Sequence, residues 1–213
     1  MIDLYTWGTP NGRKVSIALE EMGLDYTVHP INIGQDDQFS PQFLAISPNN
    51  KIPAIKDGEQ TVFESGAVLM YLARKSGKFL APEGSVEYWK TLEWLMWQMG
   101  GYGPMLGQAH HFLQFNPGLS EYAEKRYHAE AQRLSGVLNK QLGESRYLAG
   151  DELSIADFAI WPWTSRFDFQ RLDLNDYSNV KRWYVELAKR PGFIKGYDQP
   201  SSGNSIPMPE GES

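Results

Sequence analysis

Three short segments of this sequence carry polar side chains where strand-like stretches turn into helices. The first is Trp7-Gly8-Thr9-Pro10-Asn11-Gly12-Arg13, which places a hydroxyl and an amide within one turn. Unpaired N–H groups and the positive end of the helix dipole favour an anion there, and Thr9 and Asn11 add two side-chain donors. The alternative is that both residues only cap the helix. The spacing of a phosphate-binding loop, G-x-x-x-x-G-K-[ST], is missing.

The second segment is Ser47-Pro48-Asn49-Asn50-Lys51-Ile52-Pro53-Ala54-Ile55, a polar turn that enters a strand through an Ile-Pro bond. A proline at the start of a strand can be cis, and this geometry exposes the backbone N–H and C=O of Ile52. An extended peptide ligand could pair with those groups. An ordinary edge strand is the alternative.

The third segment, Phe63-Glu64-Ser65-Gly66, again leads from a strand into a helix. The Ser65 hydroxyl and the free N–H groups of the helix favour a carboxylate, while Glu64 favours an ammonium group. An α-amino acid carries both charges on one carbon and therefore fits this pair. Helix capping alone is the alternative.

The composition limits the chemistry that these segments can perform. The chain has 213 residues, 20 basic and 26 acidic side chains, a net charge of −6, and no cysteine. It therefore has no disulfide scaffold, cysteine zinc site, iron–sulfur cluster or cysteine nucleophile, and sulfur chemistry requires a thiol from another molecule. An isoelectric point near 5.3 argues against nucleic acid as a partner.

The sequence predicts a soluble, cytoplasmic protein without a metal. The longest wholly apolar run, residues 67–73, is far shorter than the roughly 20 residues of a membrane span, and the acidic start lacks the basic region of a secretory signal. His110 and His111 are neighbours on a predicted helix, so their side chains diverge by about 100° and cannot chelate one ion unaided. No G-x-S-x-G hydrolase motif occurs.

Hydrophobic periodicity predicts an α+β half followed by a helical half. Strands are expected at 2–7, 26–33, 52–56 and 61–63, with helices at 11–22, 41–45 and 64–75 and a hairpin at Asp57-Gly58. Later segments have helical period: 86–99, with a kink or break at the glycines 100–103, then 120–142, 154–162 and a last helix ended by Pro191. Ser154-Ile155-Ala156-Asp157 is a capping box. The predicted domains are 1–80, a linker 81–86, an all-helical domain 87–199 and a flexible tail 200–213.

The three polar segments, in this order and spacing, resemble the N-terminal domain of the glutathione transferase superfamily. The resemblance extends to the linker, the helical half and the capping box. The motifs that look like the bacterial nu class are Thr9-Pro10-Asn11-Gly12, residues 47–53, Trp97-Gln98-Met99-Gly100-Gly101-Tyr102-Gly103-Pro104-Met105-Leu106-Gly107-Gln108 and His110-His111-Phe112. The resemblance implies a thioredoxin-like βαβ–ββα domain, an all-α domain, a homodimer, and disulfide reduction with glutathione as co-substrate.

Site roles follow from the resemblance residue by residue. Thr9 and Asn11 would face the glutathione sulfur as the catalytic pair. Gln38 and Lys51 would hold the glycine end, Ile52 would pair with the cysteinyl backbone before cis-Pro53, and Glu64 with Ser65 would hold the γ-glutamyl end. Arg126 matches an arginine contributed across the dimer interface, although Arg126, Glu130 and Arg133 also have the spacing of a solvated ion ladder.

Trp7 occupies the position where other classes of this superfamily have a catalytic tyrosine, so the resemblance implies no tyrosine mechanism there, and Tyr5 is expected to be a strand residue. Aromatic side chains of the helical half could wall an apolar pocket beside Thr9 or could simply form the core: Trp89, Trp94, Trp97, Tyr102, Trp161 and Trp163.

With no cysteine in the chain, a mixed disulfide would have to be released by a second glutathione, so the ligand expected is a glutathione pair or its disulfide. Weak transferase or peroxidase activity could accompany disulfide reduction. The alternative function is a non-catalytic protein that binds glutathione or an apolar ligand on the same fold.

Overall fold

The computed structural model describes residues 1–201 and 203–212. The chain divides into two compact units, of which the first comprises Met1–Leu80 with Lys189–Ile206 and the second Ala81–Ala188 with Pro207–Ser213. The predicted domains were 1–80, 87–199 and a tail 200–213, with a linker 81–86. Two residues of the predicted tail, Ser202 and Ser213, lie outside the described residues.

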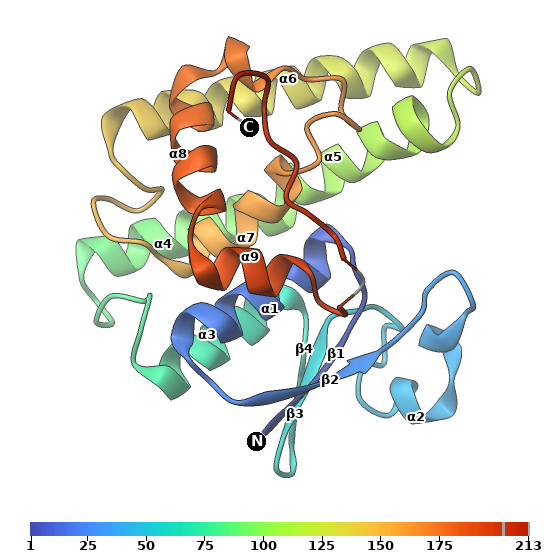
Figure 1. Ribbon diagram of the computed structural model, residues 1–213, viewed down its shortest axis with the longest axis vertical. Coiled ribbons are helices and arrows are strands. Elements are labelled where there is room, and N and C mark those ends of the chain that lie inside the picture. The colour runs from blue at the N-terminus through green and yellow to red at the C-terminus, as the bar shows by residue number, and fades with distance from the viewer. Residues whose placement is uncertain (202, 213) are drawn as a thin grey trace. The chain divides into compact units, whose positions relative to one another are not determined.

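The first unit contains a four-stranded mixed sheet (Figure 1). Its strands are β1 (Ile2–Thr6), β2 (Tyr26–Pro30), β3 (Ala54–Asp57) and β4 (Gln60–Phe63), in the order β2-β1-β3-β4. β1 runs parallel to β2 and antiparallel to β3, and β3 pairs with β4 in a hairpin that pairs Asp57 with Gln60. Gly58, with φ +61°, takes the left-handed conformation of that turn. These strands confirm the predicted βαβ–ββ order.

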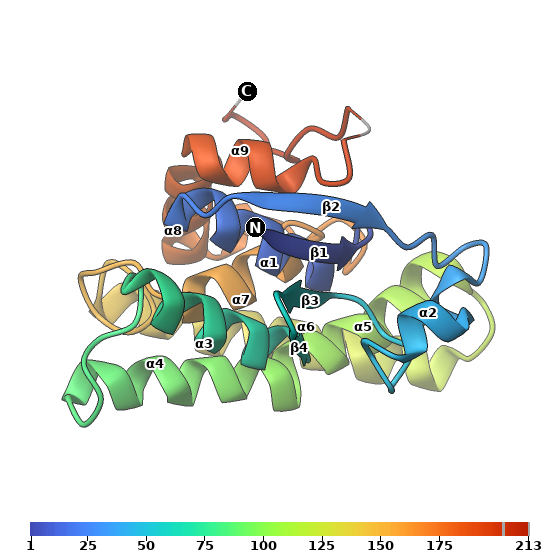
Figure 2. The same cartoon turned by 90° about the horizontal axis from the view of Figure 1, so that it is seen from below.

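Two long helices pack on this sheet. α1 (Pro10–Met22) is capped by Thr9 at its start and by left-handed Gly23 at its end, and α3 (Ser65–Ser76) contacts β3, β4 and α1. The shorter η1 (Asp37–Phe39) and α2 (Pro41–Leu44) lie away from α3 in both views (Figures 1 and 2). The core between the sheet and the two helices is fully buried and includes Leu4, Val15, Ile17, Leu19, Ile55, Val68, Leu69 and Leu72.

A further helix that the sequence did not predict, α9 (Pro191–Tyr197), belongs to this first unit. It packs on α1 so closely that a Cβ on Gly196 would lie 2.5 Å from Ile17 Cα. Ser16 Oγ donates to the Gly196 carbonyl at 2.6 Å, and Arg13 Nε donates to the Tyr197 carbonyl at 3.0 Å. Residues 189–199, which we predicted as part of the all-helical domain, belong to the sheet-bearing unit.

The second unit is helical, as predicted. A continuous helical stretch runs through α4 (Val86–Trp97), η2 (Gln98–Tyr102), α5 (Gly103–His110) and η3 (His111–Phe115), in which η2 and η3 are wider π turns. Of the kink or break predicted at the glycines, a break does not occur. Pro104 has no N–H to donate to the helical hydrogen-bond ladder. The helix continues past it with wider π turns and does not end there. A Cβ on Gly103 would lie 2.3 Å from Gln98 Nε2, so a larger residue there would have to displace the Gln98 side chain.

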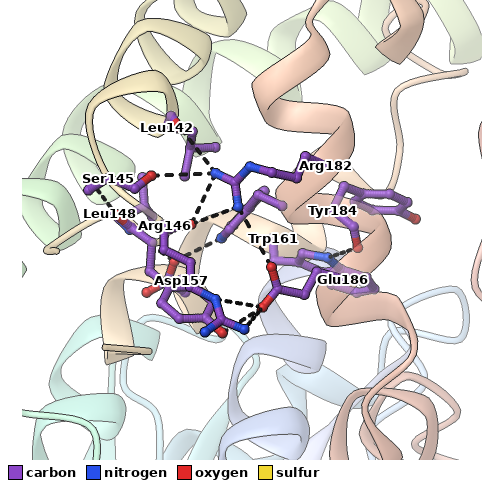
Figure 3. Close-up of polar contacts among 11 residues, drawn as sticks. Leu142, Ser145, Arg146, Leu148, Asp157, Trp161, Arg182, Tyr184 and Glu186 are labelled. Atoms are coloured by element: carbon purple, nitrogen blue, oxygen red, sulfur yellow. Dashed lines mark hydrogen bonds and ion pairs between the residues drawn. The ribbon is translucent and has the colours of Figure 1, made fainter. Parts of the chain in front are cut away.

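The remaining helices of this unit are α6 (Glu121–Glu144), α7 (Ile155–Thr164), the short η4 (Leu174–Asp176) and α8 (Ser178–Ala188). Arg182 on α8 donates to the Leu142 carbonyl in the last turn of α6 at 3.0 Å and to the Arg146 carbonyl just after this helix at 3.2 Å (Figure 3). The capping box of Ser154 and Asp157 is present, as predicted. Among the described residues, no helix is both long and apolar enough to cross a membrane.

The predicted tail is partly held by α8. Tyr184 Oη donates to the Pro207 carbonyl at 2.6 Å, Lys181 and Glu212 form an ion pair at 3.3 Å, and Pro209 is buried. These contacts place residues 207–212, part of the tail that was predicted to be flexible, against the helical unit.

His110 is a buried histidine of the helical unit. Its ring lies between Trp163 and Phe169, and the Gln170 amide nitrogen lies 3.1 Å from His110 Nε2. Because an amide nitrogen only donates, Nε2 accepts and the imidazole is neutral. Burial, aided by the charge of Arg166, lowers the pKa of His110 to about 4.

We expect this histidine to make the protein sensitive to acid. The unfolded chain binds one more proton than the folded chain between pH values of about 6.5 and 4, so stability falls as the pH drops through that range, by about 3 kcal/mol in total. His110→Phe should flatten the dependence of the urea midpoint on pH. The exposed neighbour provides the control, since His111→Phe should leave the slope unchanged. Equal slopes in all three proteins would contradict the assignment.

Candidate functional site

The sheet brings the three polar segments to the same end of its strands, which is called the sheet edge below. β1 ends at Thr6, β3 begins at Ala54 and β4 ends at Phe63, and the register pairs Ala54 with both Tyr5 and Phe63. The start of α1, the turn before β3 and the start of α3 therefore lie at the same end of adjacent strands. The first segment meets the other two, which begin 34 and 50 residues after its end, because β1 and β4 flank β3 and run antiparallel to it.

A pocket of about 150 Å³ opens at this edge. Most of the residues predicted for the site line it, and the lining is Asn11, Ser47, Lys51, Ile52, Pro53, Phe63, Glu64 and Ser65. Ser47 and Phe63 were not predicted as site residues, although they lie within the polar segments. Thr9 does not line the pocket; it is joined to it through the first turn of α1. Gln38 and Arg126 are also absent from the lining.

Thr9 performs the capping role that was the alternative to a functional one. Its Oγ1 accepts a hydrogen bond from the Gly12 N–H at 3.2 Å, and its backbone is extended, as at a helix N-cap. A hydroxyl that accepts this bond still has its own proton to donate. Asn11 stands in the first turn of the same helix and is half-buried. Capping and ligand contact are therefore compatible at Thr9.

Gly12 lets the first turn of α1 approach the end of β1. A Cβ there would lie 2.2 Å from the Trp7 carbonyl oxygen and 2.5 Å from Thr6 Oγ1. Because one of these atoms belongs to the backbone, the turn itself would have to move. We expect Gly12→Ala to lower the free energy of unfolding by about 2 kcal/mol. Gly8→Ala has no atom within 4 Å of its new Cβ and is the matched control, to be compared in urea denaturation.

Hydrogen bonds within residues 47–51 stabilise the turn before β3. Ser47 is buried, its Oγ donates to the Lys51 carbonyl at 2.8 Å, and its own carbonyl accepts from the Asn50 N–H at 2.9 Å. Asn50 takes a left-handed conformation, with φ 49°. The Ile52–Pro53 peptide bond is cis, as predicted, and the Lys51 side chain is exposed.

The backbone of Glu64, just before α3, has an unusual conformation. It is the N-cap residue, with φ 69° and ψ 116°, in a region that residues other than glycine rarely adopt. Such conformations cost about 1–3 kcal/mol and concentrate at ligand clamps. Its side chain makes no capping hydrogen bond and is exposed. The first residue of the helix, Ser65, is buried except for 6% of its surface and accepts a hydrogen bond from Lys14 Nζ at 3.3 Å.

Two predicted site residues lie outside this pocket. Gln38, in η1, donates to Asp36 Oδ1 at 3.3 Å, while its Oε1 is buried with no hydrogen-bond partner among residues 1–201 and 203–212. Arg126, on α6, is exposed and lines a second hollow of about 650 Å³ in the helical unit. Of the expected ion ladder, the Glu130–Arg133 pair forms, with both contacts at 2.8 Å.

The aromatic residues of the helical half divide between core and surface. Tyr102, Trp161 and Trp163 are buried, so the core alternative holds for these three. Trp94 and Trp97 line a hollow of about 470 Å³, and Trp89 is 58% exposed. Within residues 1–201 and 203–212, no cluster of three or more histidine, aspartate or glutamate side chains could hold a metal ion.

Comparison with known proteins supports one family for both units. The family model for the glutathione S-transferase N-terminal domain matches residues 1–74, and the model for the C-terminal domain matches residues 121–186. The disulfide-bond oxidoreductase YfcG of Escherichia coli (strain K12) is 52% identical over 198 residues, covering 90% of this chain and 92% of that protein.

Solved structures agree with this result. A glutathione transferase from Burkholderia graminis, with two glutathione molecules bound per subunit, is 39% identical, with a TM-score of 0.87 over 95% of this chain and 89% of its own. A glutathione transferase from Pseudomonas putida, with one glutathione disulfide bound per subunit, is 41% identical, with a TM-score of 0.87 over 94% and 92%. These similarities confirm the resemblance read from the motifs, and the chain belongs to the glutathione S-transferase family.

Proposed function

We propose that this protein reduces disulfides with glutathione, which it binds in the pocket at the sheet edge. The observation that carries the proposal is the convergence of Asn11, Ile52 and Glu64-Ser65 in that one pocket. These residues offer an amide donor, an exposed backbone edge, and a carboxylate beside a helix N-terminus. A tripeptide thiol with a γ-glutamyl end has groups complementary to all of them. The disulfide-bond oxidoreductase YfcG, as a similar protein, supports the same activity.

Each predicted contact has a chemical reason. Thr9 and Asn11 would donate hydrogen bonds to the glutathione sulfur and favour its thiolate. Gln38, through its Nε2 donor, and Lys51, through its ammonium group, would hold the glycine carboxylate. Ile52, before cis-Pro53, would pair with the cysteinyl backbone. Glu64 and Ser65 would bind the ammonium and carboxylate of the γ-glutamyl group.

The reaction then takes two thiol–disulfide exchanges. The bound glutathione thiolate attacks one sulfur of the substrate disulfide, a new S–S bond forms, and the second substrate sulfur leaves as a thiolate that takes up a proton. A second glutathione thiolate attacks the glutathione sulfur of this mixed disulfide, which releases the substrate thiol and glutathione disulfide. The chain has no cysteine to resolve the intermediate, so two glutathiones are consumed.

A homodimer and a cytoplasmic location complete the proposal. Val86, Trp89 and Met96, which are 64%, 58% and 53% exposed, recur at helical spacing on α4 and suit a surface covered by a second copy. Arg126 would then reach the glutathione of the partner subunit. A compartment that keeps thiols reduced would supply the co-substrate. Sedimentation velocity on the full chain tests the dimer.

The test of the function is a turnover assay with a small model disulfide and reduced glutathione, paired with calorimetry. We expect reduction of the disulfide, and binding of two glutathiones or one glutathione disulfide per subunit. Binding of glutathione without turnover would favour the alternative of a non-catalytic binding protein. Failure to bind either form would refute both.

A further inference from the structure

Lys14 is a buried cation that lies directly behind the pocket. It stands on α1, its residue is 1% exposed, and it does not line the pocket. Lysine is almost never fully buried unless it is paired. An apolar side chain of similar length would fill this place at lower cost. We therefore expect the positive charge of Lys14 to have a function at this position.

One partner of Lys14 shows where that charge acts. Nζ donates to Ser65 Oγ at 3.3 Å, and an ammonium group can only donate, so Ser65 Oγ must be the acceptor. This contact turns the Ser65 proton away from Lys14. Ser65 itself lines the pocket and is the first residue of α3. The amino end of α3, the Ser65 hydroxyl and a buried positive charge thus lie next to one another.

We propose that Lys14 is a positioning residue that selects a ligand carboxylate at the amino end of α3, by fixing Ser65 as a donor and supplying the buried charge behind it. The inference rests on the proposed function and deepens it: the carboxylate is that of the γ-glutamyl group, whose ammonium meets Glu64. The pocket would then recognise the two charges of one amino-acid centre from opposite sides.

The protonation state of Lys14 should change when the ligand binds. Burial lowers the pKa of Lys14 to about 7, against the opposing effect of the Glu64 charge. The other cation beside it, Arg13, is directed to α9, where its guanidinium lies 3.7 Å from the Tyr197 ring centroid. A bound carboxylate stabilises the charged form of Lys14, so the pKa of Lys14 rises on binding. Binding then takes up a proton at a pH above about 7.

The experiment compares two ligands in two proteins. S-methylglutathione has no titrating thiol, and its analogue with 4-aminobutanoyl in place of the γ-glutamyl group lacks only the α-carboxylate. We expect Lys14→Met to weaken S-methylglutathione about tenfold and to leave the analogue's affinity unchanged. Lys56→Met, on β3, is the control and should change neither affinity. Equal weakening of both ligands, or no weakening of either, would overturn the inference.

A second measurement needs no variant. The affinity of the wild-type protein for S-methylglutathione should fall severalfold between pH values of about 6 and 8, and the fall should be absent in Lys14→Met or, if that protein does not fold, in Lys14→Gln. A flat wild-type profile would contradict the role of Lys14. A wild-type protein that does not bind S-methylglutathione at all would instead refute the proposed function, so the two failures are distinguishable.

Discussion

Thr9→Asp raises the pKa of glutathione bound to this protein by about two pH units and leaves the stability of the fold unchanged, if Thr9 serves the sulfur as proposed. Aspartate is as good an N-cap as threonine, so its carboxylate keeps the bond from the Gly12 N–H. It has no hydroxyl proton to donate, and its charge repels a thiolate. The substitution therefore separates the two roles of Thr9.

The effect on rate is smaller than the effect on the pKa. An unperturbed thiol, with a pKa of about 8.5, is only a few per cent thiolate near neutral pH, and lowering that value by two units is worth about 2.7 kcal/mol. A more basic thiolate is also a stronger nucleophile, which offsets roughly half of the loss. We expect kcat/KM for a model disulfide to fall about tenfold in Thr9→Asp at pH values of about 6 and below, about threefold near pH 7, and less in Asn11→Ala.

The measurement is the pH dependence of the thiolate absorbance of bound glutathione, with kcat/KM over the same range. Thr9→Ser, which keeps the hydroxyl, should behave as the wild type. Thr27→Asp adds the same charge at an exposed position of β2 and should change neither quantity. An unchanged pKa and rate in Thr9→Asp would reduce Thr9 to a helix cap.

Asp157→Ala should destabilise the protein by about 4 kcal/mol, the largest expected loss of stability. The Asp157 carboxylate is completely buried and accepts from four donors: the N–H groups of Leu148 and Ser154, the Ser154 hydroxyl and the Trp183 indole. Its removal leaves these donors without their acceptor in the core of the helical unit. Figure 3 shows Asp157 among its neighbours.

Asparagine should not rescue this position. Two donors meet each carboxylate oxygen, so an amide would turn its NH₂ group toward two of them. Urea denaturation of Asp157→Ala, Asp157→Asn and the exposed control Asp151→Ala tests this, with the control expected within about 0.5 kcal/mol of the wild type. Stability of Asp157→Asn equal to the wild type would show that the four donors do not require a carboxylate.

The titration of Asp157 affects the pH dependence of stability in the opposite direction to that of His110. Burial raises the pKa of Asp157 to about 6, although its four hydrogen bonds oppose this. The stability that this raised pKa contributes is fully present below the unfolded value of about 4 and is lost as the pH rises through about 6. The two groups therefore partly cancel in the wild type, so the effect of His110 is best read from the difference between variants.

Much of the fold could be predicted because its signals are local. The hairpin at Asp57-Gly58, the capping box at Ser154 and the left-handed Gly23 each act within a few residues of themselves. The segment 191–197 was missed because Pro191 looked like the end of the last helix. The same residue can begin a helix at N1, and Phe193 and Tyr197, four residues apart, gave a weak sign of its buried face.

The sequence by itself determined the chemistry that is possible here: without cysteine the thiol must come from a ligand, and donors at two helix starts suit that ligand's charges. Only the tertiary structure decided which side chains stand behind those helix starts. Lys14 reads as an ordinary surface lysine of an amphipathic helix, yet it contacts Ser65, 51 residues away. Arg13 contacts Tyr197 across 184 residues. Burial of a charge depends on what packs over it, and that packing is set by the sheet order and by the return of α9 to the first unit.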